Sequence, residues 1–287
     1  MRVPELRVNL SVPQLAARTA ALAVDGVGLL RAEFLMSMLG HHPASLDPAK
    51  LADKLEQGLR MVAEAFYPRP VVYRVLDAKS NEMRSLMGGD AHERVEENPA
   101  LGLRGASRVI ADDSIFVVEV ATISRLRRAG LTNLQLMLPF VRVPSEVDAC
   151  WSIMESRVAD FDPSVELWVM AEVPSLALRI GELSSRVHGV SVGTNDLTQL
   201  MYGADRDNPA LAGLYEDGVD GVVLELVLEI VAAASARGMQ TCVCGDAPSR
   251  SPAVFDRLVS AGISAVSVSP EAVASLRERL TAAAATG

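Results

Sequence analysis

Eight short apolar segments, each separated from the next by a longer stretch, constrain the fold of this 287-residue chain more than any other feature. Most of them are nearly continuous runs rich in Val and Leu, which is typical of parallel strands that are buried on both faces. We therefore predict strands at residues 7–12, 26–30, 71–76, 134–139, 167–171, 189–193, 239–244 and 265–269.

The stretches between these segments have the character of helices, and several begin at Pro or a turn residue and end near Gly or Arg. Strands that alternate with helices indicate a parallel sheet. In a chain of this length, eight such units favour a closed (β/α)8 TIM barrel over an open doubly wound sheet. We predict helices at residues 13–23, 48–66, 114–129, 145–158, 176–186, 221–237 and 253–262.

The chain shows no break in composition that would mark a second domain, so we expect one domain over residues 1–287. Residues 88–100 and 205–220 are predicted to be long loops. The Ala-rich end, residues 281–287, is predicted to be a frayed tail.

Charge and cysteine content narrow the class of protein. The chain carries 27 Lys and Arg against 36 Asp and Glu, a net charge of −9. It therefore lacks the basic character expected of a partner of nucleic acid or of an anionic membrane. No apolar run reaches the roughly 18 residues of a membrane span, and the N-terminus lacks a signal-peptide layout. With only three cysteines, a disulfide framework is not expected, and we predict a cytoplasmic protein.

Polar residues lie at the carboxyl ends of five predicted strands, which is where β/α barrels carry their active sites. Glu172 and Asp196 are the hard oxygen ligands that Mg²⁺ prefers, and it commonly takes one or two carboxylates. Arginines at the same face indicate an anionic ligand, because a guanidinium matches carboxylate and phosphate oxygens in bidentate fashion. The strand-end residues are Arg31, Arg74, Glu172, Asn195 with Asp196, and Cys244.

Each of these residues alone has a simpler structural explanation. A single Arg or Glu at a strand end is more often part of a surface ion pair. Asn195 and Asp196 could cap the helix that follows them, and Cys244 could be a small buried hydrophobic residue. Their combination favours function, because one complex of an anion with a metal ion would satisfy all five strand ends.

The motifs around these residues resemble those of the PEP-utilising enzymes, where PEP is phosphoenolpyruvate. The segment from Gly26 to Phe34 resembles G-x-G-L-x-R-x-E-F/H, and the segment from Gly193 to Gln199 resembles G-[ST]-N-D-[LM]-T-Q. Cys244-Gly245 resembles the C-G-[QED] segment. The likeness covers almost the whole chain and is greatest to the phosphoenolpyruvate synthases, whose counterparts include the segments 80–82, 97–108, 139–142 and 205–207.

The resemblance implies a barrel of the phosphoenolpyruvate/pyruvate type and a role for each site residue. Arg31, Arg74 and Arg104 would hold the phosphate and carboxylate of PEP, with Arg206 nearby. Glu172 and Asp196 would coordinate Mg²⁺. Asn195, with the backbone amides from Gly193 through Thr194 to Asp196, would hold anionic oxygens of the ligand. Cys244 would give a proton to the methylene carbon of the enolate, and would remove it in the reverse direction, with Arg31 and Arg74 also catalytic.

Family members carry the phosphate on a histidine of another domain. The four histidines here, His41, His42, His92 and His188, do not lie in a T-x-x-G-G-x-x-[SC]-H setting like the family's phosphohistidine loop. We therefore expect a phosphotransferase that is incomplete as this chain alone and receives its phosphate from a phosphohistidine-bearing domain, in cis or in trans. The resemblance also suggests a homodimer, because members of the family pair through this barrel.

Two other functions fit the same residues. A Mg²⁺-dependent lyase or aldolase that acts on a pyruvate-type enolate would also use an arginine and two carboxylates. Alternatively, the chain is a non-catalytic module that kept the PEP-binding pocket. Assays of aldol cleavage and of ligand binding without turnover distinguish these functions from phosphoryl transfer.

Overall fold

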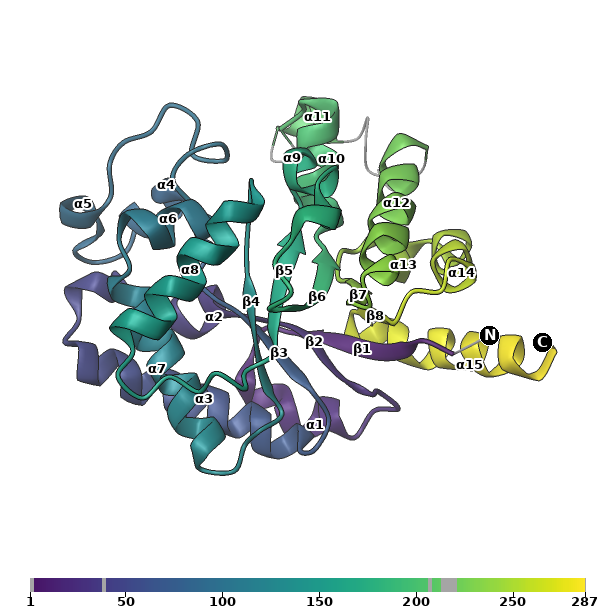
Figure 1. The fold of residues 1–287 in the computed structure, drawn as a ribbon, viewed down its shortest axis with the longest axis horizontal. Coiled ribbons are helices and arrows are strands. Elements are labelled where there is room, and N and C mark those ends of the chain that lie inside the picture. The colour runs from purple at the N-terminus through teal and green to yellow at the C-terminus, as the bar shows by residue number, and fades with distance from the viewer. Residues whose placement is uncertain (1–2, 38–39, 206–207, 213–220, 287) are drawn as a thin grey trace.

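A computed structural model describes residues 3–37, 40–205, 208–212 and 221–286 of the chain, which form a closed barrel of eight parallel strands in sequence order (Figure 1). The barrel closes where β1 pairs in parallel with β8, from Glu5 opposite Ala265 to Val8 opposite Val268. The strands are β1 (Glu5–Leu10), β2 (Gly26–Arg31), β3 (Val71–Arg74), β4 (Leu134–Leu138), β5 (Leu167–Ala171), β6 (Val187–Val192), β7 (Gln240–Val243) and β8 (Ala265–Val268).

The predicted fold class and all eight predicted strands are confirmed. The fifth strand has the predicted bounds, whereas each of the others differs by one or two residues at one or both ends. β3, for example, ends at Arg74 rather than at residue 76. Strand ends are hard to predict because they depend on where pairing with a neighbouring strand stops, which the local pattern does not encode.

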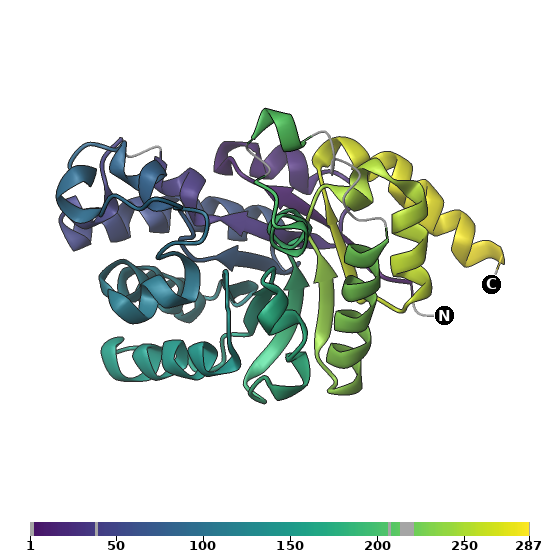
Figure 2. The ribbon, with the colours of Figure 1, turned by 90° about the horizontal axis from the view of Figure 1, so that it is seen from above.

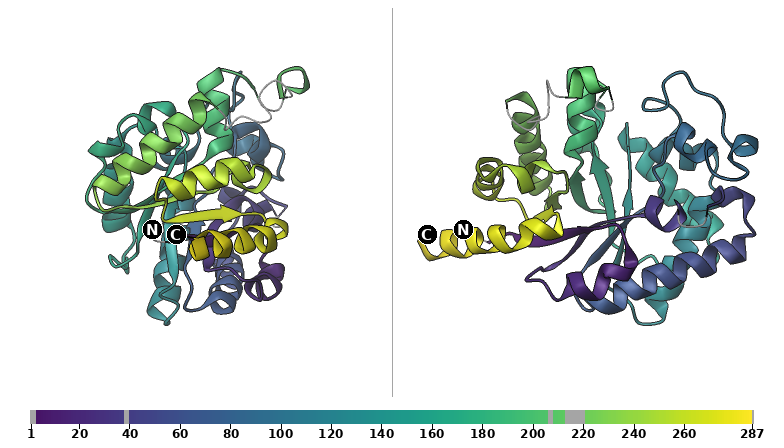
Figure 3. Two further views of the ribbon diagram at one scale, coloured as in Figure 1. Left: turned by 90° about the vertical axis from the view of Figure 1, so that its right-hand side faces the viewer. Right: turned by 180° about the vertical axis from the view of Figure 1, so that it is seen from behind.

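Helices cover the outside of the barrel (Figures 1 and 2). The longest, α3, begins at Pro48 with Asp47 as N-cap, whose carboxylate accepts hydrogen bonds from the amides of Ala49 and Lys50. α15 lies beside β1 (Figures 1 and 3). The longer helices are α3 (Pro48–Phe66), α7 (Ser114–Arg128), α8 (Pro144–Arg157), α10 (Thr194–Tyr202), α12 (Val222–Ala236), α14 (Pro252–Ser260) and α15 (Val273–Thr286).

Shorter helices occupy the connections. They are α1 (Ala16–Ala20), α2 (Ala32–Ser37), α4 (Ser80–Arg84), α5 (Gly89–His92), α6 (Gly105–Ala111), α9 (Pro174–Ala177), α11 (Pro209–Ala212) and α13 (Ala247–Arg250), with 3-10 turns η1 (Pro13–Leu15), η2 (Pro43–Ser45), η3 (Ile180–Glu182) and η4 (Pro270–Ala272).

Three predictions about the connections need correction. The single helix predicted at residues 176–186 is replaced by α9 and η3, because Pro174 starts a turn early and Gly181 disfavours helix. The predicted tail continues α15 as far as Thr286, as the high helix propensity of its alanines favours. The two predicted loops contain the short helices α5 and α11, and residues 206–207 and 213–220 lie outside the described part of the chain.

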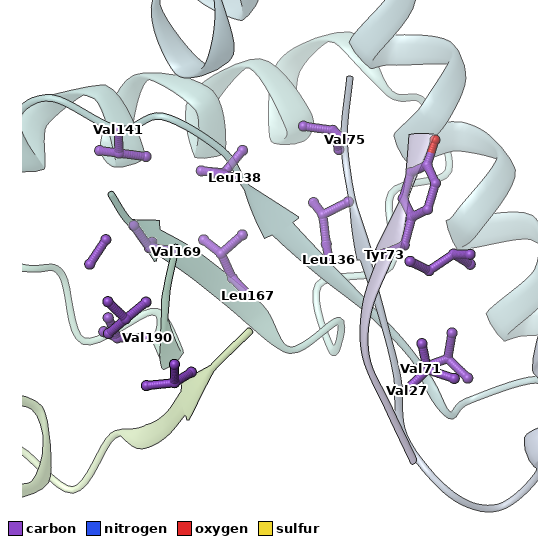
Figure 4. Close-up of a cluster of buried hydrophobic side chains, with 14 of the residues drawn as sticks. Val27, Val71, Tyr73, Val75, Leu136, Leu138, Val141, Leu167, Val169 and Val190 are labelled. Carbon is purple, nitrogen blue, oxygen red and sulfur yellow. The ribbon is translucent and has the colours of Figure 1, made fainter. Parts of the chain in front are cut away.

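Alternation along the strands divides the core into two parts. Val71 and Tyr73 of β3 point outward and join a large apolar cluster with Leu136, Leu138 and other residues beneath the helices (Figure 4). The residues between them point inward. The barrel interior holds a second cluster that consists of Leu29, Val72, Met137, Trp168, Met170, Cys242, Cys244 and Ala265. Within the described residues, no helix has the length and apolar character needed to cross a bilayer.

Candidate active site

A cavity of about 590 Å³ lies at the carboxyl ends of the strands. The predicted site residues that the structure describes all line it, although they come from six different segments of the chain. Arg206 lies outside the described residues. The residues that line the cavity include Leu29, Arg31, Glu33, Arg74, Asp77, Lys79, Glu82, Arg104, Met170, Glu172, Gly193, Thr194, Asn195, Asp196, Cys244 and Gly245.

The two-residue period of the strands explains why these groups meet. Val72 points into the barrel, so Arg74, which follows it by two residues, points to the same side. Trp168 also points inward, and Met170 and Glu172 follow it by two and four residues and share its side. Cys244 follows Cys242 in the same way on β7. The side chains that lie deep in the strands fill the interior, and those at the carboxyl ends form the floor and wall of the cavity.

Two of the arginines are held by carboxylates. Arg104 donates from Nε and Nη2 to the two oxygens of Asp77, at 2.9 and 2.6 Å. Its Nη2 also lies 3.5 Å from Asp196 Oδ2. Arg74 lies 3.2 Å from Glu33 and 3.7 Å from Asp77. Burial acts to lower the pKa of Arg74, but these carboxylates raise it by more, so the guanidinium stays charged.

Arg31 differs from the other two arginines. It is the last residue of β2 and is only partly buried. Within the described residues, it forms no ion pair or hydrogen bond through its side chain. A cation without a protein counter-charge at the wall of a cavity is available to an anionic ligand.

Glu172 is a deeply buried carboxylate of the cavity, and its Oε1 accepts a hydrogen bond of 2.8 Å from the amide of Phe140. Burial raises its pKa to about 8, and the nearby charges of Asp196 and Asp77 add to this effect. Such a pair of crowded carboxylates is stabilised in its ionised form by a bound cation.

The donors and the charge of the cavity suit Mg²⁺. Glu172 and Asp196 supply the two carboxylates that this ion commonly uses. Among the described residues, no group of three or more His, Cys, Asp or Glu forms a cage, so water or ligand oxygens would complete the coordination. The cavity wall carries four cationic and five acidic side chains, and a multiply charged anion would need a divalent cation to balance it. The site therefore fits the ion.

Three of the residues that line the cavity carry a buried donor without a partner. Arg74 Nε, Arg104 Nη1 and Thr194 Oγ1 have no hydrogen-bond partner within the described part of the chain. Buried polar atoms are almost always paired, so unpaired donors that line a cavity indicate a ligand with oxygen acceptors. Thr194 begins α10, whose first amides are further donors for an anion.

Cys244 lies at the inner end of the cavity and is fixed through its backbone. Its amide donates to the carbonyl of Val192 at 3.1 Å, and its own carbonyl accepts from Asn9 Nδ2 at 3.0 Å. Its Sγ lies 3.6 Å from the same Val192 carbonyl. Burial raises the pKa of the Cys244 thiol, so the group is protonated at neutral pH. It is suited to donating a proton.

The structure adds residues that sequence reasoning did not assign. Asp77 holds Arg104 and contacts Arg74, and Glu33 accepts a 2.6 Å hydrogen bond from the amide of Asp77. Both had a sequence signal, since Asp77 follows the third strand and Glu33 lies two residues after Arg31. Asn195, which was predicted, donates to Asp246 at 3.3 Å.

Glu119 of α7 supports the site from behind β3. Its Oε1 accepts from the hydroxyl of Tyr73 at 2.7 Å and from the amide of Leu76 at 3.0 Å, which fixes the segment that leads to Asp77. Burial raises the pKa of Glu119 to about 8. The same carboxylate oxygen accepts both hydrogen bonds, so the amide oxygen of a glutamine could accept them equally well.

The buried Glu119 is expected to make the stability of the protein depend on pH. Between about pH 4.3 and 8 the unfolded chain releases this proton while the folded protein keeps it. The free energy of unfolding therefore falls as pH rises, by up to about 1.4 kcal/mol per pH unit. Denaturant unfolding of Glu119→Gln should show a flatter dependence over this range. The exposed Glu155, replaced by Gln, is the control, and equal curves for Glu119→Gln and the wild type would contradict the assignment.

Gly245 permits the close contact between the β7 end and α10. A Cβ at this position would lie 1.7 Å from Thr194 Oγ1 and 2.9 Å from Thr194 Cβ.

We expect Gly245→Ala to lower the free energy of unfolding by about 1–3 kcal/mol, because the start of α10 must move. Gly181→Ala is the control, since a Cβ there would have no neighbouring atom within 4 Å. Thermal unfolding of the two variants measures the difference, and equal stabilities would contradict this packing.

Comparison with known proteins identifies the family to which the chain belongs. Residues 2–285 match the family described as the PEP-utilising enzyme, PEP-binding domain. The chain belongs to this PEP-binding domain family. Its relatives include a probable phosphoenolpyruvate synthase of Staphylothermus marinus, 41% identical over 282 residues, which covers 95% of this chain and 34% of the relative. The phosphoenolpyruvate synthase of Pyrococcus furiosus is 38% identical over 278 residues, with coverage of 95% and 34%.

The chain thus spans about a third of the length of these synthases and corresponds to their PEP-binding domain. The predicted resemblance to phosphoenolpyruvate synthases is confirmed.

Solved structures of lower identity share the barrel. A malate synthase of Haloferax volcanii superposes with a TM-score of 0.54 at 14% identity, over 95% of this chain and 72% of that one. An HpcH/HpaI aldolase/citrate lyase family protein of Burkholderia cenocepacia gives a TM-score of 0.54 at 16% identity, over 99% and 94%. At such identities the likeness supports the fold of this PEP-binding domain and carries no argument about its reaction.

Proposed function

We propose that this chain is the PEP/pyruvate-binding barrel of a phosphotransferase like the phosphoenolpyruvate synthases. In this reaction the phosphoryl group passes between a phosphohistidine, carried by another domain or chain, and the enolate of pyruvate. The observation that carries the proposal is the convergence of Arg31, Arg74 and Arg104 with Glu172, Asp196 and Cys244 on one cavity.

The arginines would bind and orient the ligand. Arg74 and Arg104 are already fixed by Asp77, so they lose little freedom when an anion arrives. Their unpaired Nε and Nη1 donors would take phosphate or carboxylate oxygens. Arg31, with no counter-charge in the described part of the chain, would supply the remaining positive charge.

Glu172 and Asp196 would hold Mg²⁺. When bound, the ion supplies a charge that stabilises the developing enolate oxygen and the phosphoryl group. Asn195 and Thr194, with the first amides of α10, would donate to the same ligand oxygens.

Cys244 would transfer the proton at carbon. When PEP gives up its phosphoryl group, the Cys244 thiol would protonate C3 of the pyruvate enolate and become a thiolate. In reverse, the thiolate would take a proton from the pyruvate methyl group. Burial and the charge of Glu172 act to raise the pKa of this thiol, whereas the charges of Arg31 and Arg74 act to lower it and so favour the thiolate formed in the first direction.

The phosphohistidine partner, in cis or in trans, and the pairing of two barrels in a homodimer are part of the same proposal. Both rest on family membership. A cytoplasmic location is also proposed, as expected for such an enzyme.

Exchange of the pyruvate methyl protons tests the reaction chemistry without a phosphate donor. Proton NMR in D₂O with Mg²⁺ should show loss of the pyruvate methyl signal in the presence of the intact protein. An aldolase acts through the same enolate and would also exchange these protons, but it would in addition cleave 4-hydroxy-2-oxo acids to pyruvate, which a lactate dehydrogenase-coupled assay detects. Binding of PEP without exchange would support the non-catalytic alternative, and cleavage would support the lyase.

A further inference from the structure

The segment that follows β4 contains a buried phenylalanine in an unusual backbone conformation. Phe140 has a φ of 45°, which lies in the left-handed region that side chains other than glycine rarely adopt, and its side chain is buried. Such strain persists only when the surrounding structure holds it in place, and it clusters near functional sites. Phe140 does not line the cavity, so ligand contact does not explain it.

The ring and the backbone amide of Phe140 each contact a residue of the proposed site. Its ring lies beneath a guanidinium, with Arg104 Cζ 4.1 Å from the ring centroid. Its backbone amide donates to Glu172 Oε1 at 2.8 Å. One residue therefore touches an anion-binding arginine through its ring and a metal-binding carboxylate through its backbone.

Further contacts hold Phe140 and Arg104 together. Arg142 lies on the same ring, with its Cζ 4.7 Å from the centroid, and donates to the carbonyls of Arg104 at 3.3 Å and Gly102 at 2.8 Å. Gly105 has a φ of 59°, and a Cβ there would lie 2.5 Å from Phe140 Cβ. The segment that carries Arg104 is thus packed directly on Phe140.

We propose that Phe140 is a positioning residue, which sets Arg104 through its ring and Glu172 through its amide so that the anion and metal subsites keep a fixed relation. The ring complements what Asp77 does, because Asp77 fixes the edge of the guanidinium while Phe140 fixes its face. A desolvated cation–π contact of this kind is strong enough to hold a side chain in one orientation. The inference rests on the proposed function for its consequence in PEP binding.

The test replaces the ring and keeps the backbone amide. Phe140→Leu remains apolar and retains the bond to Glu172 but loses the cation–π contact, whereas Phe140→Tyr retains the ring. Calorimetry with PEP and Mg²⁺ should show binding weakened between about threefold and thirtyfold in the leucine variant and within about twofold of wild type in the tyrosine variant.

Phe66→Leu is the matched control. Phe66 is also buried and also lies under an arginine, with Arg69 Cζ 4.9 Å from its ring centroid, but outside the cavity. The Phe66→Leu variant should lose thermal stability, as we also expect of Phe140→Leu, but its affinity for PEP should stay unchanged. Equal affinities of Phe140→Leu and wild type, or an equal loss in Phe66→Leu, would overturn the proposal.

A second measurement does not depend on PEP. Modification of Arg104 by phenylglyoxal, followed by peptide mass spectrometry, should be several times faster in Phe140→Leu than in wild type or Phe66→Leu. An unchanged rate would overturn the positioning role even if PEP binds. A faster rate in a protein that does not bind PEP would leave the positioning role intact and reject the proposed function.

A double-mutant cycle links the ring to the arginine. If Phe140 acts on PEP through Arg104, adding Phe140→Leu to Arg104→Met should weaken PEP binding by less than about twofold further. A full additive loss would show that Phe140 acts by another route and would contradict the proposal.

Discussion

Replacing Cys244 with alanine is expected to slow exchange of the pyruvate methyl protons by about 100- to 10,000-fold, the usual contribution of a positioned acid or base. The thiol is buried at the inner end of the cavity with its proton retained, and its backbone is fixed by Val192 and Asn9. Affinity for PEP should change by less than about threefold, since the neutral thiol contributes no charge to the site. Proton NMR in D₂O measures the exchange, and calorimetry measures the binding.

Cys242→Ala is the matched control for this prediction. Cys242 belongs to the same strand and is also buried, but it does not line the cavity, and burial raises its pKa to about 12. Its variant should exchange pyruvate protons within about twofold of the wild type. Normal exchange by Cys244→Ala would show that another group or water transfers the proton.

The second large effect is expected at the proposed metal ligands. Glu172→Gln should weaken Mg²⁺-dependent binding of PEP by more than about 100-fold, because an amide is a poorer ligand and carries no charge. The glutamine can still accept the hydrogen bond from the Phe140 amide, so the loss reports on the metal rather than on the local fold. Calorimetric titrations with PEP in excess Mg²⁺ and in EDTA measure the change.

A control for this variant lies at the other end of the same strand. Glu166 precedes β5 at the opposite face of the barrel, next to Gln135 and His188, and Glu166→Gln should bind PEP like the wild type. In EDTA, binding of PEP should be lost in Glu172→Gln and in the wild type alike. If Glu172→Gln kept full Mg²⁺-dependent affinity, the ion would have to bind elsewhere.

Much of the fold could be predicted because the barrel is encoded locally. Strands buried on both faces need continuous apolar runs, and the run at Leu167–Ala171 has the same bounds in sequence and structure. The same period of two places Arg74, Glu172 and Cys244 on the inner face at the carboxyl ends. The sequence therefore predicts which polar residues share the cavity, once a barrel is assumed.

The contacts that support the cavity could not be predicted, because they depend on tertiary packing. Nothing in the local pattern indicates that Phe140 adopts a positive φ or that its amide meets Glu172. The burial of Glu119 behind β3 likewise follows from how α7 packs.

Calorimetric titration of the intact protein with PEP is the most direct test of the central claim that this cavity binds PEP together with Mg²⁺. We expect saturable binding, one PEP per barrel, that requires Mg²⁺, is abolished by EDTA and is competed by pyruvate. Substituting Arg74 with Met should remove the binding while the fold remains. Absence of binding in excess Mg²⁺, or equal binding in EDTA, would contradict the account.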